Sequence, residues 1–407
     1  MLAHPVTCQA TWPSLPHTTL TICLNGVTHV VELEGIGRKL TLRTASKILR
    51  ILGTYPRLRE QIYGPRNAPR KELIGYTTMD LSRLVWGSHI RMAELTGALQ
   101  IATFHGSYPE RLLAAMLNGL WRARNVLFFE YVSSPQENRL LERLRRTGQR
   151  RILDVHDIPH LQQRFMGVKV STRANHDFDS FARKCELLVF PSHTLAGMYA
   201  DEFPLLPRFA VLPNAANPTR FASTPLPAQK VFLYIGGYAK SRGVNLLLDA
   251  FRMVRKRRRD IWLNIVSLGI SRTLLGLRKQ DGITLMPNIT YDRGSPEVFR
   301  QSYACIIPHL RNPYMDAAMP IKLFESMASA RPVISTNCYE MAKIVTSERC
   351  GVVVEENARD LADAIETLAN DRKAAERMGA RGRIAVEARH SWKIRAKSLM
   401  TVLKSDS

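Results

Sequence analysis

Acidic residues are scarce in this sequence compared with basic ones. Its 407 residues include 35 Asp and Glu against 58 Lys and Arg, which gives a formal net charge of +23 at pH 7. Such a balance favours polyanions or an anionic membrane surface as partners, and it carries no information about the fold. An Arg-rich composition or a heat-adapted surface is the alternative explanation.

Cysteine motifs are also missing. None of the six cysteines belongs to a CxxC pair or to a Cys/His spacing of the kind that binds zinc. We therefore expect no metal site, and reduced thiols in a cytosolic protein are the simplest interpretation. The six are Cys8, Cys23, Cys185, Cys305, Cys338 and Cys350.

Long apolar runs and targeting patterns are absent as well. No run reaches the roughly 18 to 20 residues of a membrane-spanning helix, and the start, MLAHPVTCQATWPSLP, lacks the basic-then-apolar order of a signal peptide. No GxGxxG motif indicates a dinucleotide, and no basic motif interleaved with aromatics indicates a specific nucleic-acid partner. We expect a cytoplasmic protein, soluble or peripheral on the inner face of the membrane.

The length exceeds one ordinary core, so two domains and an appendage are expected. In residues 1–70, the β-rich runs TLTICL and VTHVVEL flank Asn25 and Gly26, which predicts a hairpin. Residues 42–63 have helical spacing, and the basic, Pro-punctuated stretch that follows reads as a linker. This part is predicted to be an α+β appendage.

From residue 71 the pattern alternates between strands and helices, as in a doubly wound α/β domain. Residues 111–124 form a basic amphipathic stretch, interpreted as a crossover helix, with a membrane-surface helix as the alternative. The expected strands are 73–79, 100–106, 126–132, 151–159, 185–192 and 208–213, and the expected helices are 89–100, 111–124, 137–151 and 193–203.

His156 and Asp157 stand at the carboxyl end of one predicted strand. Open α/β sheets bind ligands at that end, so both are candidate functional residues. A turn with a satisfied histidine is the alternative.

A second α/β domain follows the Pro-rich linker 214–230, beginning with strand 231–237 and helix 244–260. That helix ends in the RKRRR run at 255–259, interpreted as a solvated helix end or as a patch for a polyanion or membrane. Further strands and helices continue to the C-terminus.

The run PIKLFESMASARPVIST, residues 320–336, reads as a turn, a short helix and a strand. Lys322 and Glu325 are three residues apart, so they share a helix face near the N-terminus of the helix, where anions bind. A cation beside phosphate and a carboxylate that accepts from sugar hydroxyls suit a nucleotide-sugar. An ordinary charged surface helix is the alternative.

This run, the "HD" at a strand end, the V-x-P-N at 211–214 and Trp392 after Ser391 together resemble GT-B glycosyltransferases of the family-4-like kind, group 1. The resemblance implies an α/β GT-B fold with two doubly wound Rossmann-like domains facing across a cleft, plus the N-terminal appendage. The implied boundaries are 1–70, 71–213 for the acceptor side, 214–385 for the nucleotide-sugar, and 386–407 for a helix crossing back.

By this resemblance, the protein transfers a sugar from a nucleotide-diphosphate sugar to a hydroxyl acceptor, without a tightly bound metal. The implied catalytic residues are His156, Asp157, Arg242 and Lys322. The implied donor-binding residues are Gly236, Gly237, Lys240, Arg242, Asp316, Met319, Pro320, Ile321, Lys322 and Glu325. The implied acceptor-side residues are Trp86, Gly87 and Ser88.

The sequence departs from the family pattern at three positions. Ala330 stands where the family has Gly, Gly237 replaces the first phosphate-binding cation, and Ala317 replaces a Glu eight residues before Glu325. Lys240 or Lys322 is the candidate to compensate for the lost cation. Asp316 is the candidate to replace the carboxylate, or it caps a turn.

The stereochemistry therefore stays open. A retaining reaction, which the resemblance favours, needs no protein base, and His156 then orients the donor sugar or the acceptor. For an inverting reaction Asp157 is the candidate base. Two alternatives to transfer remain: a non-catalytic GT-B-like binding protein at a membrane surface, and a nucleotide-sugar epimerase.

Overall fold

The computed structural model describes residues 8–9, 17–24, 27–34, 71–77, 87–101, 112, 115, 120–131, 135–167, 169, 171–203, 207–267, 282–287 and 295–405. Strands in these ranges form three sheets. The first sheet has the order β1-β2-β3, with β1 at Cys8–Gln9, β2 at His17–Leu24 and β3 at Val27–Glu34.

The N-terminal hairpin is confirmed. Strands β2 and β3 pair antiparallel, and Leu24 lies opposite Val27, so two residues connect them. Strand β1, which pairs with β2, was not predicted. The predicted helix at 42–63 lies outside the described residues.

The second sheet has five strands in the order β4-β5-β6-β7-β8, and β4, β5 and β6 pair parallel. Most of their side chains are buried, which explains the nearly continuous apolar runs. The predicted strand 100–106 and most of the predicted helix 111–124 lie outside the described residues. The strands are β4 Lys71–Tyr76, β5 Ala123–Phe128, β6 Arg150–Asp154, β7 Leu187–Phe190 and β8 Arg208–Val211.

The helices in this part of the chain begin and end at recognisable signals. Gly148, with φ of 73°, follows α5, and Ser192 caps α8 by accepting from the N–H of Leu195. Helices α6 and α7 were not predicted. The helices are α3 Gly87–Leu99, α5 Pro135–Arg146, α6 Pro159–Met166, α7 Thr172–Ala182 and α8 His193–Glu202, with a 3-10 turn η1 at Leu120–Arg122.

The third sheet has six parallel strands in the order β11-β10-β9-β12-β13-β14. The order reverses between β9 and β12, and such a switch point is where open α/β sheets bind ligands. The strands are β9 Lys230–Ile235, β10 Ile261–Ser267, β11 Ile283–Pro287, β12 Ala304–Ile307, β13 Val333–Thr336 and β14 Gly351–Val354.

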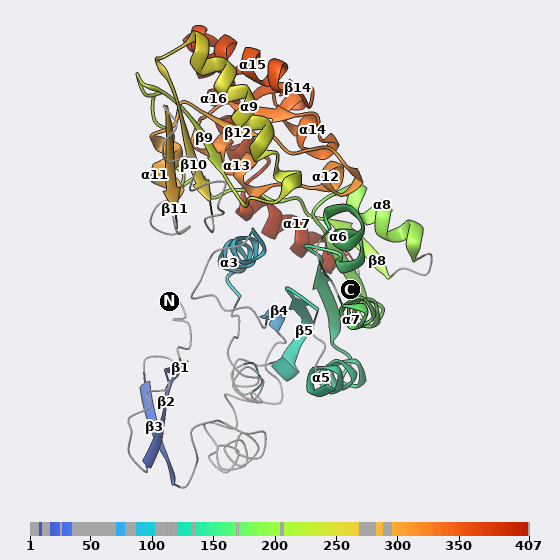
Figure 1. Cartoon of the computed structure of the whole chain (residues 1–407). Helices are drawn as coiled ribbons and strands as arrows, with labels where there is room; N and C mark the ends of the chain where they lie inside the picture. The colour runs from blue at the N-terminus through green and yellow to red at the C-terminus, as the bar shows by residue number, and fades with distance from the viewer. Residues whose placement is uncertain are drawn as a thin grey trace. The chain divides into compact units, whose positions relative to one another are not determined.

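Helices accompany this sheet as the alternating pattern predicts (Figure 1). Helix α9 packs with α15 around a buried apolar core, and α13 packs with α16. The helices are α9 Val244–Arg257, α11 Ser295–Arg300, α12 Pro313–Ala317, α13 Ile321–Ala328, α14 Tyr339–Ser347, α15 Ala358–Asn370, α16 Arg372–Ala388 and α17 Trp392–Lys404, with a 3-10 turn η2 at Lys240–Arg242.

The basic run at the end of α9 is used for packing. Buried Arg255 donates to the carbonyls of Arg259 and Ile261, and its guanidinium lies 5.2 Å from the ring centroid of Trp262. Arg257 lies 3.4 Å from Asp363 and from Glu366 on α15. Arg258 forms an ion pair with Asp260. Arg255 and Arg257 of this run therefore contact the elements next to α9, and the ion pair of Arg258 is local.

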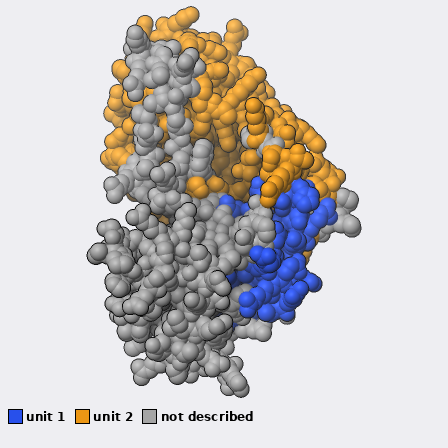
Figure 2. All heavy atoms as spheres, turned by 60° about the horizontal axis from the view of Figure 1, so that its bottom comes forward, with its two compact units in different colours: residues 1–80, 100–154, 176–188 blue, residues 81–99, 155–175, 189–407 orange. Residues whose placement is uncertain are grey.

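The chain divides into two compact units that interleave along the sequence (Figure 2). The first comprises residues 1–80, 100–154 and 176–188, and the second comprises 81–99, 155–175 and 189–407. Within the second unit α17 packs against α3, and the Arg91 guanidinium lies 6.0 Å from the ring centroid of Trp392. The domain boundaries expected from the sequence stay a prediction.

Transmembrane helices are not found in the described ranges. No helix there is both long enough and apolar enough to cross a membrane.

Candidate functional site

The switch point of the six-stranded sheet carries two loops that touch through their backbones. Gly236 and Gly237 follow β9, and His309 stands two residues after β12. Gly243 has a φ of 68°, and a Cβ there would lie 1.6 Å from the carbonyl oxygen of Pro308. Because no side chain fits, glycine is required for this close approach. The N–H of Leu310 also donates to the carbonyl of Ser241 at 2.9 Å.

Lys322, in the first turn of α13, extends towards the end of β9. Its Nζ lies 5.3 Å from the ring centroid of Tyr234, and a Cβ on Gly236 would lie 2.4 Å from Nζ. Burial, and then the neighbouring charge of Arg242, lower the pKa of Lys322 to about 7. The Tyr234 hydroxyl donates to the carbonyl of Gly237 at 2.6 Å, and this hydrogen bond fixes the orientation of the ring beside Lys322.

Arg242 belongs to the same cluster. Its Nη1 lies 3.4 Å from Nε2 of the fully buried His309. Burial is the main cause that lowers the pKa of His309 well below its ordinary value, and the charges of Arg242 and Lys322 add to it. Sequence reasoning missed His309. The available signal was a histidine just beyond a predicted strand, in the run IIPHL.

Glu325 is the acidic member of the helix face that the sequence predicted. Only 4% of its surface is exposed, and Oε1 has no hydrogen-bond partner among the described residues. Burial, and then the charge of Glu94, raise the pKa of Glu325 to about 8, while Lys322 and Arg220 act in the opposite direction. A buried carboxyl oxygen without a donor is available for ligand hydroxyls.

The entry to α13 is held by residues distant in sequence. Asn214 Nδ2 donates to the carbonyl of Met319 at 2.6 Å, and Ser192 Oγ donates to the carbonyl of Ala317 at 2.7 Å. Arg91 in turn donates to Asn214 Oδ1 at 3.1 Å. The helix N-terminus, with Pro320 as its N-cap and Ile321 as its first residue, is thereby fixed in place.

Asp316 lies in α12 and has other partners. Its carboxylate pairs with Arg311 at 3.0 Å and accepts from the N–H of Tyr339, the first residue of α14, at 2.9 Å. The contact with Tyr339 joins residues 23 positions apart, so it is not the local turn cap that was the alternative, and the role of Asp316 towards the donor sugar stays a prediction.

His156 and Asp157 lie in the loop between β6 and α6. The Tyr314 hydroxyl donates to Asp157 Oδ1 at 2.7 Å. Burial, with the Asp157 charge second, raises the pKa of Tyr314 well above its ordinary value. Asp157 therefore helps to hold α12, and its role as a base stays a prediction.

The remaining predicted residues are placed only in part. Trp86 lies outside the described residues, while Gly87 and Ser88 form the start of α3, so that helix begins two residues earlier than predicted. Lys240 is exposed in η2, next to Arg242. In the portions of the chain that the structure describes, no group of three His, Cys, Asp or Glu residues suits a metal ion.

Comparisons with known proteins find a family model and several similar chains. Residues 229–371 match the family model described as "Glycosyl transferases group 1". A D-inositol 3-phosphate glycosyltransferase of Paenarthrobacter aurescens is 27% identical over 158 residues, which cover 36% of this chain and 37% of the relative. An alpha-D-kanosaminyltransferase of Streptomyces kanamyceticus is 25% identical over 210 residues, covering 49% and 50%. The chain thus spans about half or less of these relatives.

Solved structures resemble a larger part of the chain. Sucrose-phosphate synthase from Thermosynechococcus elongatus superimposes with a TM-score of 0.61 at 15% identity, covering 82% of this chain and 99% of that one. The Anabaena HepE structure in complex with UDP and glucose gives 0.58 at 13% identity, covering 82% and 100%. This likeness shows the fold and confirms the prediction of two parallel Rossmann-like sheets of the GT-B kind.

Proposed function

Because the chain belongs to the group 1 glycosyltransferases and has the GT-B fold, we propose that it transfers a sugar from a nucleotide-diphosphate sugar to a hydroxyl acceptor. One observation carries the proposal. The buried Glu325 oxygen, which has no hydrogen-bond partner in the described part of the chain, lies one helix turn from Lys322, in a cluster that also includes Arg242. This is an arrangement for a ligand with hydroxyls at one end and phosphates at the other.

Glu325 is assigned to the ribose. An ionised carboxylate accepts two hydroxyl hydrogen bonds, and such charge-assisted bonds are stronger than neutral ones. Since the pKa of Glu325 is raised to about 8, nucleotide binding at neutral pH must favour release of its proton or use its protonated form as a donor.

Lys322 and Arg242 are assigned to the diphosphate, with the N–H groups at the start of α13. When the bond between the sugar and the β-phosphate breaks, negative charge grows on that phosphate, and fixed cations stabilise it most in the transition state. The bound diphosphate is a dianion beside Lys322, so it raises the lowered pKa of Lys322 and keeps this side chain charged. In this scheme the two side chains supply the positive charge that a tightly bound metal supplies elsewhere.

The stereochemical course belongs to the same proposal. In the retaining course His156 orients the sugar or the acceptor and no protein base is needed. In the inverting course Asp157 takes the acceptor proton, and the hydrogen bond from Tyr314 must then weaken to free its carboxylate. The loop ending at Gly87 and Ser88 is proposed to face the acceptor.

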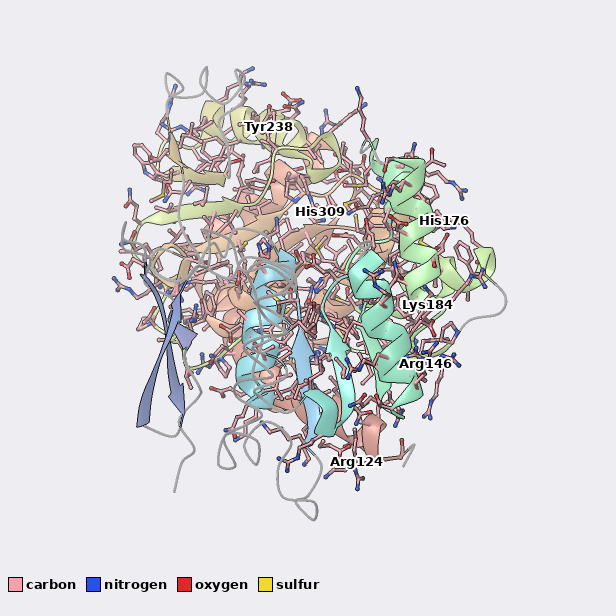
Figure 3. The ribbon with its side chains drawn as sticks, turned by 90° about the horizontal axis from the view of Figure 1, so that it is seen from below. Arg124, Arg146, His176, Lys184, Tyr238 and His309 are labelled. Carbon is pink, nitrogen blue, oxygen red and sulfur yellow. The ribbon has the colours of Figure 1, made fainter. Side chains whose placement is uncertain are left out.

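Peripheral association with an anionic membrane is proposed as well. The side chains proposed to face the membrane are exposed cations of the first unit (Figure 3). They lie at strand starts and helix ends, which meet at one edge of a parallel sheet: Arg124, Arg143, Arg145, Arg146 and Arg183. Co-sedimentation with anionic vesicles should weaken steeply with salt, and equal binding to neutral vesicles contradicts the proposal.

The experiment on the main proposal is a thermal-shift screen of the parent protein with UDP, GDP, ADP and TDP. Binding to the folded state alone raises the apparent stability, so one diphosphate should raise the Tm. The sugar donor of that nucleotide is then incubated with the protein. Slow release of free sugar or transfer supports the proposal, an epimerised donor supports an epimerase, and an unchanged donor indicates a binding protein.

A further inference from the structure

His309 has no role so far, although it lies at the centre of the switch point. It follows β12, the central strand that neighbours β9, and its side chain is completely buried (Figure 3). The main chain at this residue is fixed independently, because its carbonyl accepts from the Thr336 hydroxyl at 2.6 Å and from the Cys338 thiol at 3.6 Å. The imidazole itself is not needed for that anchoring.

The contact with Arg242 determines which ring nitrogen carries a proton. Arg242 Nη1 lies 3.4 Å from His309 Nε2, and a guanidinium has only N–H donors. Nε2 must therefore accept, which leaves the proton of a neutral imidazole on Nδ1. Burial and the two neighbouring cations keep the ring neutral, because they lower its pKa well below the ordinary value.

Among the residues that the structure describes, the Nδ1–H group then has no acceptor, and Nδ1 is buried. A buried donor without an acceptor costs free energy, and such a group in a native protein calls for a partner that completes it. The partner must be an acceptor that also tolerates the adjacent charges of Arg242 and Lys322, and an anionic oxygen meets both conditions.

We propose that His309 is a further donor-binding residue, whose Nδ1–H donates a hydrogen bond to an oxygen of the nucleotide diphosphate. This inference rests on the proposed function and deepens it. One end of the ring orients Arg242 and the other end contacts the phosphate, so the imidazole sets the spacing between guanidinium and diphosphate. Protein atoms cover Nδ1, so the ring or a neighbour must shift as the diphosphate enters.

A matched pair of variants tests the hydrogen bond. In His309→Asn the amide nitrogen occupies the position of Nδ1 and keeps a donor there. In His309→Gln the longer side chain reaches the position of Nε2 and keeps an acceptor for Arg242, but it has no donor at Nδ1. The probe is whichever of UDP, GDP, ADP and TDP binds the parent most tightly, with its nucleoside as the control ligand.

By calorimetry we expect His309→Asn to bind the diphosphate within about threefold of the parent, and His309→Gln to bind it at least about tenfold more weakly. Both variants should bind the nucleoside as the parent does. Unchanged diphosphate binding in His309→Gln overturns the inference, as does a loss that extends equally to the nucleoside. The parent's own binding separates the two claims, since a parent that binds no diphosphate overturns the proposed function together with this inference.

A measurement on the parent protein avoids the risk that a variant misfolds. With ¹⁵N-labelled histidine, the Nδ1–H signal of His309 is assigned as the one missing from His309→Asn. Addition of the diphosphate should shift this proton downfield, and the nucleoside should leave it in place. An Nδ1 that carries no proton, or a signal that the diphosphate does not move, overturns the inference.

Discussion

Gly236 and Lys322 share one small space: a Cβ built on Gly236 would lie 2.4 Å from Lys322 Nζ. Gly236 follows β9 and Lys322 lies in the first turn of α13, so an absent side chain on one element makes room for the cation of another. The ring of Tyr234, 5.3 Å away, forms a second wall. The glycine therefore determines where the ammonium group lies.

The first prediction is that Gly236→Ala displaces Lys322 and also lowers the stability of the protein. The nearest clashing atom is the end of the flexible Lys322 side chain, which can move, but Gly236 has a φ of 158°, which an alanine rarely adopts. We expect diphosphate binding to weaken by roughly tenfold, because the displaced Lys322 loses one charged hydrogen bond to the diphosphate. Calorimetry with the diphosphate and a thermal melt check both parts.

Gly237→Ala is the matched control, since a Cβ at Gly237 meets nothing within 4 Å. It should bind the diphosphate as the parent does. If both alanine variants lose binding equally, the loop conformation matters and the contact with Lys322 does not.

The second prediction separates the two ends of the donor. Glu325→Ala removes the carboxylate assigned to the ribose, so nucleoside monophosphate and diphosphate should both bind more weakly, by about 1.5–3 kcal/mol. Arg242→Ala removes a phosphate contact only, so the diphosphate should lose far more affinity than the nucleoside, and turnover should fall. Calorimetry decides the outcome: unchanged diphosphate binding in Glu325→Ala shows that α13 does not hold the donor.

Much of this site could be predicted from the sequence because its rules are local. Lys322 and Glu325 share a face through their spacing alone, and apolar runs indicate the strands β6, β9 and β12. Their ends were less certain: the predicted strand 151–159 ends at Asp154, and the predicted strand 231–237 ends at Ile235. Helix α7 was within reach as well, because its buried Phe178, Phe181 and Ala182 have helical spacing.

The rest depends on partners that the sequence does not bring together. The tautomer of His309 is set by Arg242, 67 positions away, and Arg257 finds Asp363 across 106 positions. Asp316 is bound by a backbone N–H of α14. Charge counts and motif spacing predict which types of residue take part in such contacts. Which residues contact each other depends on the packing of β9, β12 and their helices.

The third prediction concerns the folding free energy that the buried charge of Lys322 costs the ligand-free protein. Its folded pKa of about 7 lies below its unfolded value near 10.5, so the folded state binds the proton less well. Below pH 7 the lysine is charged in both states and opposes folding in full. Between pH 7 and 10.5 the folded state sheds the proton first, and the penalty disappears as pH rises.

Lys322→Met should therefore raise the stability of the ligand-free protein at pH 6 by about 1 kcal/mol or more, given about 1.4 kcal/mol per pKa unit. The gain should shrink towards pH 10, and diphosphate binding should be lost. Thermal melts across this pH range check the slope. Lys240→Met, at an exposed position of the same loop, should show no such pH-dependent gain. A Lys322→Met variant that is less stable at pH 6 contradicts the argument.

The last prediction follows from the strained turn after α13. Ala330 stands where the resembling family has glycine, and its φ is 54°, in the left-handed region. The left-handed conformation costs an L-residue with a Cβ about 1–2 kcal/mol of folding free energy. Glycine removes this cost but lowers the stability by about 0.4–1 kcal/mol, because it increases the entropy of the unfolded chain. Ala330→Gly should therefore stabilise the protein by about 0.5–1 kcal/mol, measured by denaturant unfolding of the parent and the variant. Ala328→Gly, at the last residue of α13, should destabilise by a similar amount, because glycine lowers helix propensity and Ala328 is fully buried. A loss of stability in Ala330→Gly would show that the Cβ of Ala330 contributes more through packing than the left-handed backbone costs.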